Sequence, residues 1–328
     1  MSSASAPGKI ILFGEHAVVY SRPALAVPVL QVHADAAADL TTDDEADKRI
    51  RTDLGEKDWR SRIFIEAPDI GLFSTLDALL SDQTPHPLAA VIINVFQFLG
   101  ITTPPAIRIR VTSSIPVASG LGSGAAVSVA LIRALASAVQ RPLSDDQVNV
   151  LAYEIEKLHH GTPSGIDNSV VTYAMPVYFV RGQPIETLRV GAPFTLVIGY
   201  TGVSAPTKES VGDVRKLWEA DKPRWEKVFD QVGEIAQGAR AAIETGNTSA
   251  LGPLMDANHA LLQALTVSSV ELDQLVLAAK AVGAEGAKLS GGGRGGNMIA
   301  LVASEKAEAV ATALRSAGAR STITTTIQ

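Results

Sequence analysis

Charged side chains bracket a short apolar run near the start of the chain, in the stretch APGKIILFGEH. Lys9 precedes the run IILF, and Glu15 and His16 follow Gly14 directly after it. A surface salt bridge or solvated strand ends would explain these charges. A lysine in this place can instead face a phosphoryl group during its transfer. The residues alone leave both interpretations open.

Two carboxylates in the middle of the chain lie on either side of an expected sharp turn that follows a helix. Glu156 lies near the end of an expected helix, and Asp167 follows the turn-rich segment HHGTPSGID. Taken alone, Glu156 fits a solvated helix residue, whereas Asp167 is flanked by apolar and small residues. Phosphoryl transfer requires one carboxylate that holds Mg²⁺ and another that orients or deprotonates a hydroxyl group.

The stretch ASGLGSGAAVS, residues 118–128, is dense in small residues and lies between an expected strand and an expected helix. The N-terminus of a helix presents free N–H groups and a partial positive charge, so such a loop can close around phosphate oxygens. The stretch is neither a Walker A loop nor G-x-G-x-x-G, because Ala125 stands where the last glycine belongs. Its shape favours phosphate binding and close helix packing equally.

A second glycine-rich stretch, SGGGRGG, satisfies G-x-G-x-x-G at Gly291, Gly293 and Gly296. A dinucleotide-binding loop must open a helix, but here the strand-like run NMIALV follows. The pattern therefore predicts the loop of a β-hairpin, which taken alone is a flexible connection.

The elements that position these residues can be read from the periodicity of the apolar residues. A polar segment at 41–62 is expected to be a solvated loop or an irregular hairpin. Ser144 with Asp145 is expected to cap a helix that ends before Gly161. Strands are expected at 9–14, 23–40, 106–115, 170–180, 194–200, 286–290, 296–302 and 321–327. Helices are expected at 87–100, 125–139, 145–160, 208–220, 224–245, 248–265, 269–282 and shortly before the last strand.

Composition excludes several classes of protein. The chain has 328 residues, a formal net charge of −6 and no cysteine. This charge offers no attraction to nucleic acid or anionic membranes, and disulfides, thiolate metal sites and cysteine nucleophiles are excluded. The N-terminus lacks the pattern of a signal peptide and no membrane span is expected, so we expect a cytoplasmic protein.

Together, these motifs resemble the kinase superfamily of galactokinase, homoserine kinase, mevalonate kinase and phosphomevalonate kinase, and within it the mevalonate-kinase family closely. Four segments carry the resemblance, in this order along nearly the whole chain: APGKIILFGEHAVVYSRPALA, PVASGLGSGAAVS, EKLHHGTPSGIDN and AKLSGGGRGGNMIAL. The resemblance implies a two-lobed α+β fold with a ribosomal-S5-like N-terminal domain and a ferredoxin-like C-terminal domain. Gly and Pro cluster in RGQPIETLRVGAP, residues 181–193, and this predicts the domain boundary, with domains at 1–182 and 183–328. The active site is then expected in the cleft between them.

The resemblance also implies a function and a role for each matched residue. The expected enzyme is an ATP-dependent kinase of mevalonate, with Asp167 as the catalytic aspartate and Lys9 as the lysine beside it. Glu156 matches the Mg²⁺ ligand. Residues near the substrate are matched by Glu15, His16 and Thr207. The ATP phosphate loop is matched by Pro116, Ser119, Gly120, Leu121, Gly122, Ser123, Gly124 and Ala125.

The phosphate loop departs from the family at one position. The family commonly has G-L-G-S-S-A, and its second serine is the one usually assigned to Mg²⁺, but this chain has Gly124 there. Either Ser123 supplies the hydroxyl ligand or water replaces it, because Mg²⁺ readily keeps several waters.

The expected cofactors and partners are ATP, Mg²⁺ and mevalonate, with a homodimer as an open alternative and neither nucleic acid nor membrane. Galactokinase and phosphomevalonate kinase are the competing functions within the superfamily. The first motif continues as AVVYSRPALA rather than into the aspartate and tyrosine of a sugar site, and it has no basic cluster for a phosphorylated substrate. A diphosphomevalonate decarboxylase would lack G-E-H. A non-catalytic member of the fold could have lost its acid and base, whereas Lys9, Glu156 and Asp167 are all present.

Overall fold

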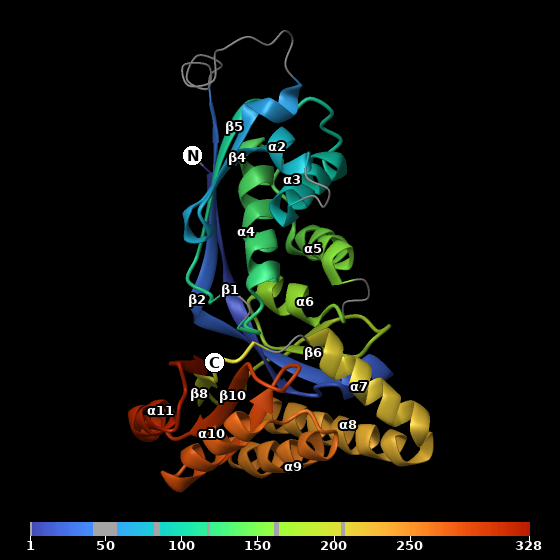
Figure 1. Ribbon diagram of the computed structural model, residues 1–328, viewed down its shortest axis with the longest axis vertical. Coiled ribbons are helices and arrows are strands. Elements are labelled where there is room, and N and C mark those ends of the chain that lie inside the picture. Colours follow the sequence, from blue (N-terminus) through green and yellow to red (C-terminus); the bar gives the residue numbers. More distant parts are fainter. Residues whose placement is uncertain (1, 42–57, 82–85, 117–118, 161–163, 205–206) are drawn as a thin grey trace. The chain divides into compact units, whose positions relative to one another are not determined.

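Two compact units make up the chain, and each unit is built from segments that are distant in sequence (Figure 1). The computed structural model describes residues 2–41, 58–81, 86–116, 119–160, 164–204 and 207–328. The first unit comprises Met1–Pro7, Val32–Ile115 and Ser123–Thr172, and the second comprises Gly8–Gln31, Pro116–Gly122 and Tyr173–Gln328. A domain boundary between residues 182 and 183 stays a prediction.

The strands of the first unit alternate buried and exposed side chains. In β5, Ile107, Ile109 and Val111 are buried and the two arginines between them are exposed, as expected when successive side chains point to opposite faces. The pairs β4–β3 and β5–β2 are antiparallel, and β3–β5 is parallel. The bounds are β2 (Ala24–Leu40), β3 (Ile63–Ala67), β4 (Leu72–Thr75) and β5 (Ile107–Ser113). The predicted strands at 23–40 and 106–115 are confirmed, while β3 and β4 were not predicted.

Helices cover one face of these strands (Figure 1). They are α2 (Leu76–Leu80), α3 (Pro87–Phe98), α4 (Ser123–Ala138), α5 (Asp145–His160) and α6 (Ile166–Tyr173). The predicted cap of α5 is confirmed, because the N–H of Gln147 donates to Oγ of Ser144 at 3.3 Å. The N–H of Ser144 in turn donates to Oε1 of Gln147 at 3.0 Å, so the two residues cap the helix reciprocally.

The strand predicted at 170–180 is wrong for its first part, because residues 166–173 form the helix α6. Only β6 (Val177–Phe179) is extended. The β-branched residues Val170, Val171 and Thr172 favour a strand by propensity. Oγ of Ser169 donates to the carbonyl oxygen of Gly165 at 2.6 Å, a hydrogen bond that belongs to the helical turn, and all three β-branched residues are buried there. Burial therefore outweighs propensity.

The second unit contains an antiparallel sheet of order β11–β8–β10–β9, with helices packed against it (Figure 1). Its core includes Phe229, Leu262, Leu275, Met298 and Leu314. The strands are β8 (Phe194–Tyr200), β9 (Gly286–Ser290), β10 (Asn297–Val302) and β11 (Ser321–Ile327). The helices are α7 (Thr207–Ala220), α8 (Lys222–Thr245), α9 (Leu251–Ala264), α10 (Val270–Ala281) and α11 (Ala307–Ser316). These strands and helices confirm the elements predicted beyond residue 190, and the α+β fold is confirmed.

Three further strands, β1, β6 and β7, join the sheet that contains β2. Strand β1 (Ser2–Phe13) pairs with β2, and β6 pairs with β2 at Ala24–Ala26 and with β7 (Glu186–Thr187).

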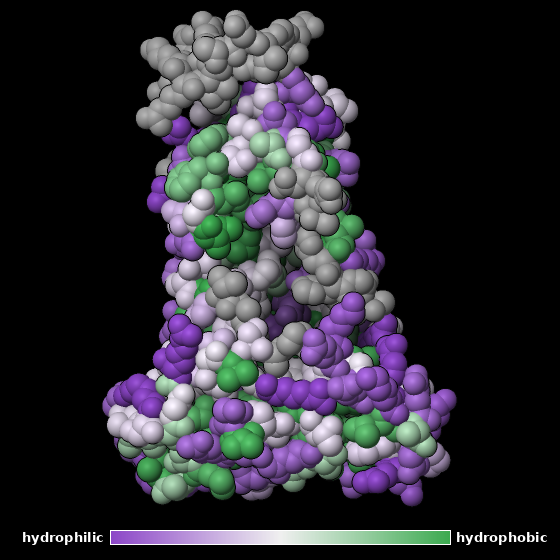
Figure 2. All heavy atoms as spheres, in the orientation of Figure 1, coloured by the Kyte–Doolittle hydropathy of each residue, from purple (hydrophilic) through white to green (hydrophobic). Residues whose placement is uncertain are grey.

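Over the described residues, no helix is both long and apolar enough to cross a lipid bilayer. The visible face of α7 is mainly hydrophilic (Figure 2).

Candidate active site

The segment Gly14–His16 turns the chain sharply after β1 and carries two predicted substrate residues into the interior. Gly14 has φ +94°, and a Cβ atom there would lie 2.4 Å from the carbonyl oxygen of Pro23, so only glycine fits. Glu15 and His16 are only 1% and 5% exposed. The interpretation of these residues as solvated strand ends is therefore wrong.

Lys9 lies in β1 and packs against the predicted phosphate loop in the same unit. Its backbone N–H donates to the carbonyl oxygen of Leu121 at 2.9 Å. A Cβ atom on Gly122 would lie 2.8 Å from Cγ of Lys9, so the lysine stem occupies the space that the glycine leaves. Lys9 is 5% exposed, which also excludes the surface salt bridge. The predicted catalytic cation and the predicted phosphate loop are neighbours.

A buried lysine that the sequence analysis missed, Lys288 in β9, pairs with Glu15. Its Nζ donates to Oε1 of Glu15 and, at 2.7 Å, to the carbonyl oxygen of Leu289. Both side chains of the ion pair are fully buried. Burial raises the pKa of Glu15 and lowers the pKa of Lys288, and the attraction between the two charges opposes both shifts. The signal in the sequence is a single charge inside the otherwise small and apolar strand GAKLS.

His16 is held by the second glycine-rich stretch. Its Nε2 lies 3.1 Å from the carbonyl oxygen of Gly292, and because a carbonyl can only accept, Nε2 carries the proton. Burial lowers the pKa of His16 to about 4, with a smaller contribution from the positive charge of Arg294. The ring is therefore neutral at pH 7. Its buried Nδ1 has no hydrogen-bond partner among the described residues and is a free acceptor.

The described part of the phosphate loop, residues 119–122, has two glycines in left-handed conformations. Gly120 has φ +79° and Gly122 has φ +76°. The carbonyl oxygen of Ser119 accepts a hydrogen bond from Nδ2 of Asn297 at 2.5 Å. The loop runs directly into α4 at Ser123, as the sequence analysis predicts. Val117 and Ala118 lie outside the described residues.

The residues at the start of α4 differ in their surroundings. Ser123 is half-buried, Gly124 is exposed and Ala125 is 1% exposed. A Cβ atom on Gly124 would meet no atom within 4 Å, so close helix packing does not explain this glycine. Pro116, at the other end of the loop, is exposed, and its carbonyl oxygen accepts from the N–H of Ser119 at 3.3 Å.

The glycine-rich hairpin loop between β9 and β10 is closely packed. A Cβ atom on Gly293 would lie 1.9 Å from the carbonyl oxygen of Val267, and one on Gly295 would lie 2.6 Å from that of Val203. Arg294 donates from NH1 to Oδ2 of Asp213 in α7 at 2.6 Å. Lys216 and Arg294 lower the pKa of Asp213 to about 2. The predicted hairpin is confirmed, and these contacts favour a fixed loop over a flexible one.

The two predicted carboxylates lie in the first unit, on helices that a buried amide pair joins. Glu156 is half-buried in α5, and Asp167 is half-buried in the first turn of α6. Nδ2 of Asn168 donates to Oδ1 of Asn149 in α5 at 2.6 Å. The start of α6 is therefore held against α5, the helix that carries Glu156. Gly161–Pro163, within the turn between them, lie outside the described residues.

The donor set for Mg²⁺ is sparse. Within the described ranges, no group of three or more His, Cys, Asp or Glu side chains could enclose a metal ion. Mg²⁺ is commonly held by one or two carboxylates together with substrate phosphates and water. A half-buried Glu156 and the half-buried hydroxyl group of Ser123 fit that mode of binding better than a protein cage.

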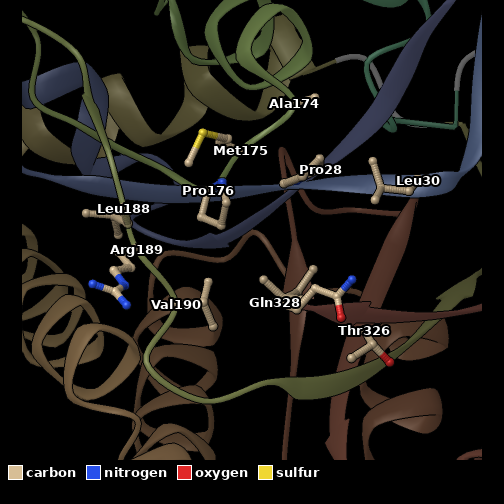
Figure 3. A pocket seen from close by; sticks show the side chains of 11 residues that line it. Pro28, Leu30, Ala174, Met175, Pro176, Leu188, Arg189, Val190, Thr326 and Gln328 are labelled. Atoms are coloured by element: carbon tan, nitrogen blue, oxygen red, sulfur yellow. The ribbon is translucent and has the colours of Figure 1, made fainter.

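Thr207 and an apolar cavity complete the account of the predicted site residues. Thr207, the remaining predicted substrate residue, is the first residue of α7, and its side chain lies outside what the structure describes. A cavity of about 240 Å³ in the second unit is lined mainly by apolar side chains, among them Leu30, Met175 and Leu188 (Figure 3). None of the predicted site residues lines it, so we do not assign the reaction to this cavity.

Comparison with known proteins decides the family. The model of the GHMP kinases N terminal domain matches residues 88–175, and that of the GHMP kinases C terminal domain matches residues 239–320. The mevalonate kinase of Thermococcus sibiricus is 38% identical, over 98% of this chain and 95% of the relative. The chain belongs to the mevalonate kinase family of the GHMP kinases.

Other members of this family match over nearly their whole length. The mevalonate kinase of Saccharolobus solfataricus is 32% identical, over 92% of this chain and 90% of the relative. The crystal structure of the L. major mevalonate kinase in complex with R-mevalonate has a TM-score of 0.81 and 27% identity, covering 100% of this chain and 96% of that chain. The predicted resemblance to this family is therefore confirmed.

Proposed function

We propose that this chain transfers the γ-phosphoryl group of ATP to a hydroxyl group of mevalonate, giving 5-phosphomevalonate and ADP in the mevalonate pathway of isoprenoid biosynthesis. The observation that carries this proposal is the contact between Lys9 and the loop at Leu121 and Gly122. It places a buried cation beside a loop that leads into a helix N-terminus, where anions bind. The identity of the acceptor is supported by the family membership and by relatives named mevalonate kinase.

On the phosphate side, the chain supplies charge neutralisation. The backbone N–H groups of residues 119–125 donate to phosphate oxygens, and Lys9 stabilises the charge that develops on the transferred group. Glu156 would hold Mg²⁺ together with the hydroxyl group of Ser123 or a water molecule in its place, and the bound ion would neutralise phosphate charge. Lys9 already contacts the loop at Leu121 and Gly122 without substrate, which reduces the reorganisation needed during transfer.

On the acceptor side, Asp167 takes the proton. As the substrate oxygen bonds to the γ-phosphorus, its proton moves to the Asp167 carboxylate and the bond from the γ-phosphorus to the oxygen of ADP breaks. Glu15, His16 and Thr207 orient mevalonate. His16 offers Nδ1 as an acceptor for a substrate hydroxyl, because its Nε2 proton is engaged by Gly292.

A coupled ADP-release assay on the purified chain with ATP and Mg²⁺ tests this function. Mevalonate, phosphomevalonate, galactose and homoserine are compared as acceptors. We expect ADP release with mevalonate at a rate far above the other three. Turnover with galactose or phosphomevalonate instead would assign the competing function, and no release with any acceptor would favour a non-catalytic member of the fold.

We further propose that the enzyme works in the cytoplasm, which the cysteine-free sequence supports. A homodimer stays a prediction. Sedimentation equilibrium of the purified chain would distinguish a monomer from a dimer.

A further inference from the structure

The phosphate loop is held at two carbonyl oxygens by groups from opposite ends of the sequence. The carbonyl oxygen of Leu121 accepts from the backbone N–H of Lys9 at 2.9 Å. The carbonyl oxygen of Ser119 accepts from Nδ2 of Asn297 at 2.5 Å, across 178 residues of sequence. All four residues belong to the second unit. A side chain and a strand backbone thus hold alternate peptide groups of one loop.

Asn297 is itself fixed in place. It is the first residue of β10, where it pairs with Tyr200 of β8 on one side and Ser290 of β9 on the other. It is only 1% exposed, and the loop before it is anchored at Gly293 and Gly295 by close backbone contacts. A strand residue paired on both sides has little freedom to shift, so its amide group is a rigid donor.

Holding a carbonyl oxygen also sets the direction of the next N–H group. The peptide group is planar and trans, so the C=O of one residue and the N–H of the next point in opposite directions. The described backbone has no cis peptide bonds. Fixing the carbonyl oxygens of Ser119 and Leu121 therefore directs the N–H groups of Gly120 and Gly122 away from Asn297 and Lys9. Both glycines have positive φ, a conformation that glycine adopts without a steric cost.

Unused polar atoms remain beside this contact. Oδ1 of Asn297 and Oγ of Ser119 are buried and have no hydrogen-bond partner in the described part of the chain. A buried polar group without a partner costs free energy. The polar network around Ser119 is therefore incomplete until a polar ligand or water reaches it.

From these contacts we infer that Asn297 is a positioning residue for ATP. It acts through the backbone of Ser119 to aim the N–H group of Gly120 at a phosphate oxygen. The inference rests on the proposed function for the identity of the nucleotide. It predicts that loss of the amide donor weakens nucleotide binding and leaves mevalonate binding nearly unchanged.

Direct titration of the purified full chain with ADP and with ATP, by calorimetry and without mevalonate, tests this role. The variants are Asn297→Ala and Asn297→Asp, the second of which keeps the size of the side chain but loses the N–H donor. We expect Kd for the nucleotide to rise about tenfold, as for a lost hydrogen bond at the upper end of the usual range. In steady-state kinetics, KM for ATP should rise while KM for mevalonate stays within about twofold.

A matched control is available in the same unit. Asn258 in α9 is also a fully buried asparagine, and its amide atoms have no hydrogen-bond partner among the described residues. Asn258→Ala and Asn258→Asp should change the melting temperature but not the nucleotide Kd. Any general effect of disturbing a buried asparagine would appear in both pairs of variants.

Three results would overturn the inference. The first is a folded Asn297 variant, judged by its near-ultraviolet circular dichroism, with a nucleotide Kd within twofold of the parent. The second is an equal loss of nucleotide affinity in the Asn258 variants. The third is failure of both Asn297 variants to fold, which would make Asn297 a purely structural residue. Because the titration contains no mevalonate, failure of the chain to phosphorylate mevalonate would leave this comparison intact and would reject only the proposed function.

Discussion

The predicted site residues of the two units differ in their burial. In the second unit, Lys9, Glu15 and His16 are almost completely buried, and Gly14 permits the turn that places the last two. In the first unit, Glu156 and Asp167 are half-buried near the ends of helices. The buried set is positioned by packing, whereas the two carboxylates are positioned by the helices that carry them.

The difference in burial fits two different chemical roles. Groups that stabilise charge gain strength when water is excluded and their geometry is fixed before the reaction. A group that accepts a proton and a group that binds a hydrated metal ion need access to substrate and water. We therefore expect substitutions in the buried set to change folding as well as rate, and substitutions of the carboxylates to change rate with little effect on folding.

The largest effect on rate is expected from Asp167→Asn. The change keeps the size of the side chain and removes the proton acceptor, so kcat should fall by about 10² to 10⁴-fold. Kd for ATP, measured by titration, and the melting temperature should stay near those of the parent. An unchanged kcat would contradict the assignment of Asp167, and a large loss of stability would contradict the separation of the two regions.

The largest effect on stability is expected from Lys288→Met. It leaves the Glu15 carboxylate buried without its partner, so the free energy of unfolding should fall by about 3–5 kcal/mol. Urea denaturation measures this change. The double variant Lys288→Met with Glu15→Gln should recover part of the loss, because no unpaired charge then remains in the interior.

The half-exposed pair Arg240 and Glu186, also in the second unit, supplies the control for that experiment. Arg240→Met should lower the free energy of unfolding by less than about 1 kcal/mol, because an exposed ion pair usually contributes no more than that to stability. If Lys288→Met and Arg240→Met lowered the free energy of unfolding equally, burial of the ion pair between Lys288 and Glu15 would have no special importance for stability.

A smaller effect on rate is expected from Lys9→Met. Methionine retains much of the stem that packs against Gly122 and loses only the ammonium group. We expect kcat to fall by about 100-fold, the cost of losing one stabilising group at a developing charge. A change in KM alone, with kcat preserved, would assign Lys9 to binding rather than to the chemical step.

The smallest effect is expected from Gly124→Ser, which restores the hydroxyl group that the family commonly has there. A Cβ atom at this position meets no neighbour within 4 Å, so the serine fits. The Mg²⁺ concentration for half-maximal rate should fall severalfold, measured at saturating ATP and mevalonate. Gly124→Ala is the matched control. Because the residue lies in the first turn of α4, it should stabilise the helix by less than about 1 kcal/mol, and it should not change the Mg²⁺ requirement.

If Ser123 supplies the hydroxyl ligand, Ser123→Ala should raise the Mg²⁺ requirement in the parent and lose that effect in the Gly124→Ser background. An equal Mg²⁺ requirement for Gly124→Ser and Gly124→Ala would show that no hydroxyl group acts at this position.

Most regular elements could be predicted because their signals are local. The alternation of Ile107, Ile109 and Val111 indicates a half-buried strand, and Ser144 with Gln147 forms a cap from residues three apart. The short strands β3 and β4 were missed because they follow a polar segment without periodicity. Helix α6 was mistaken for a strand because Val170, Val171 and Thr172 favour extended structure until tertiary burial selects the helix.

The sequence by itself determined the family, because four motifs in order are specific even when each is weak. It also indicated which residues carry charge and which segments are rich in glycine. Only the tertiary structure decided that Lys288 neutralises Glu15 and that Asn297 holds the phosphate loop at Ser119. These contacts join residues 273 and 178 positions apart. No local pattern encodes such pairs, because they form only when β9 and β10 are packed into the same unit as Gly8–Gln31 and the loop.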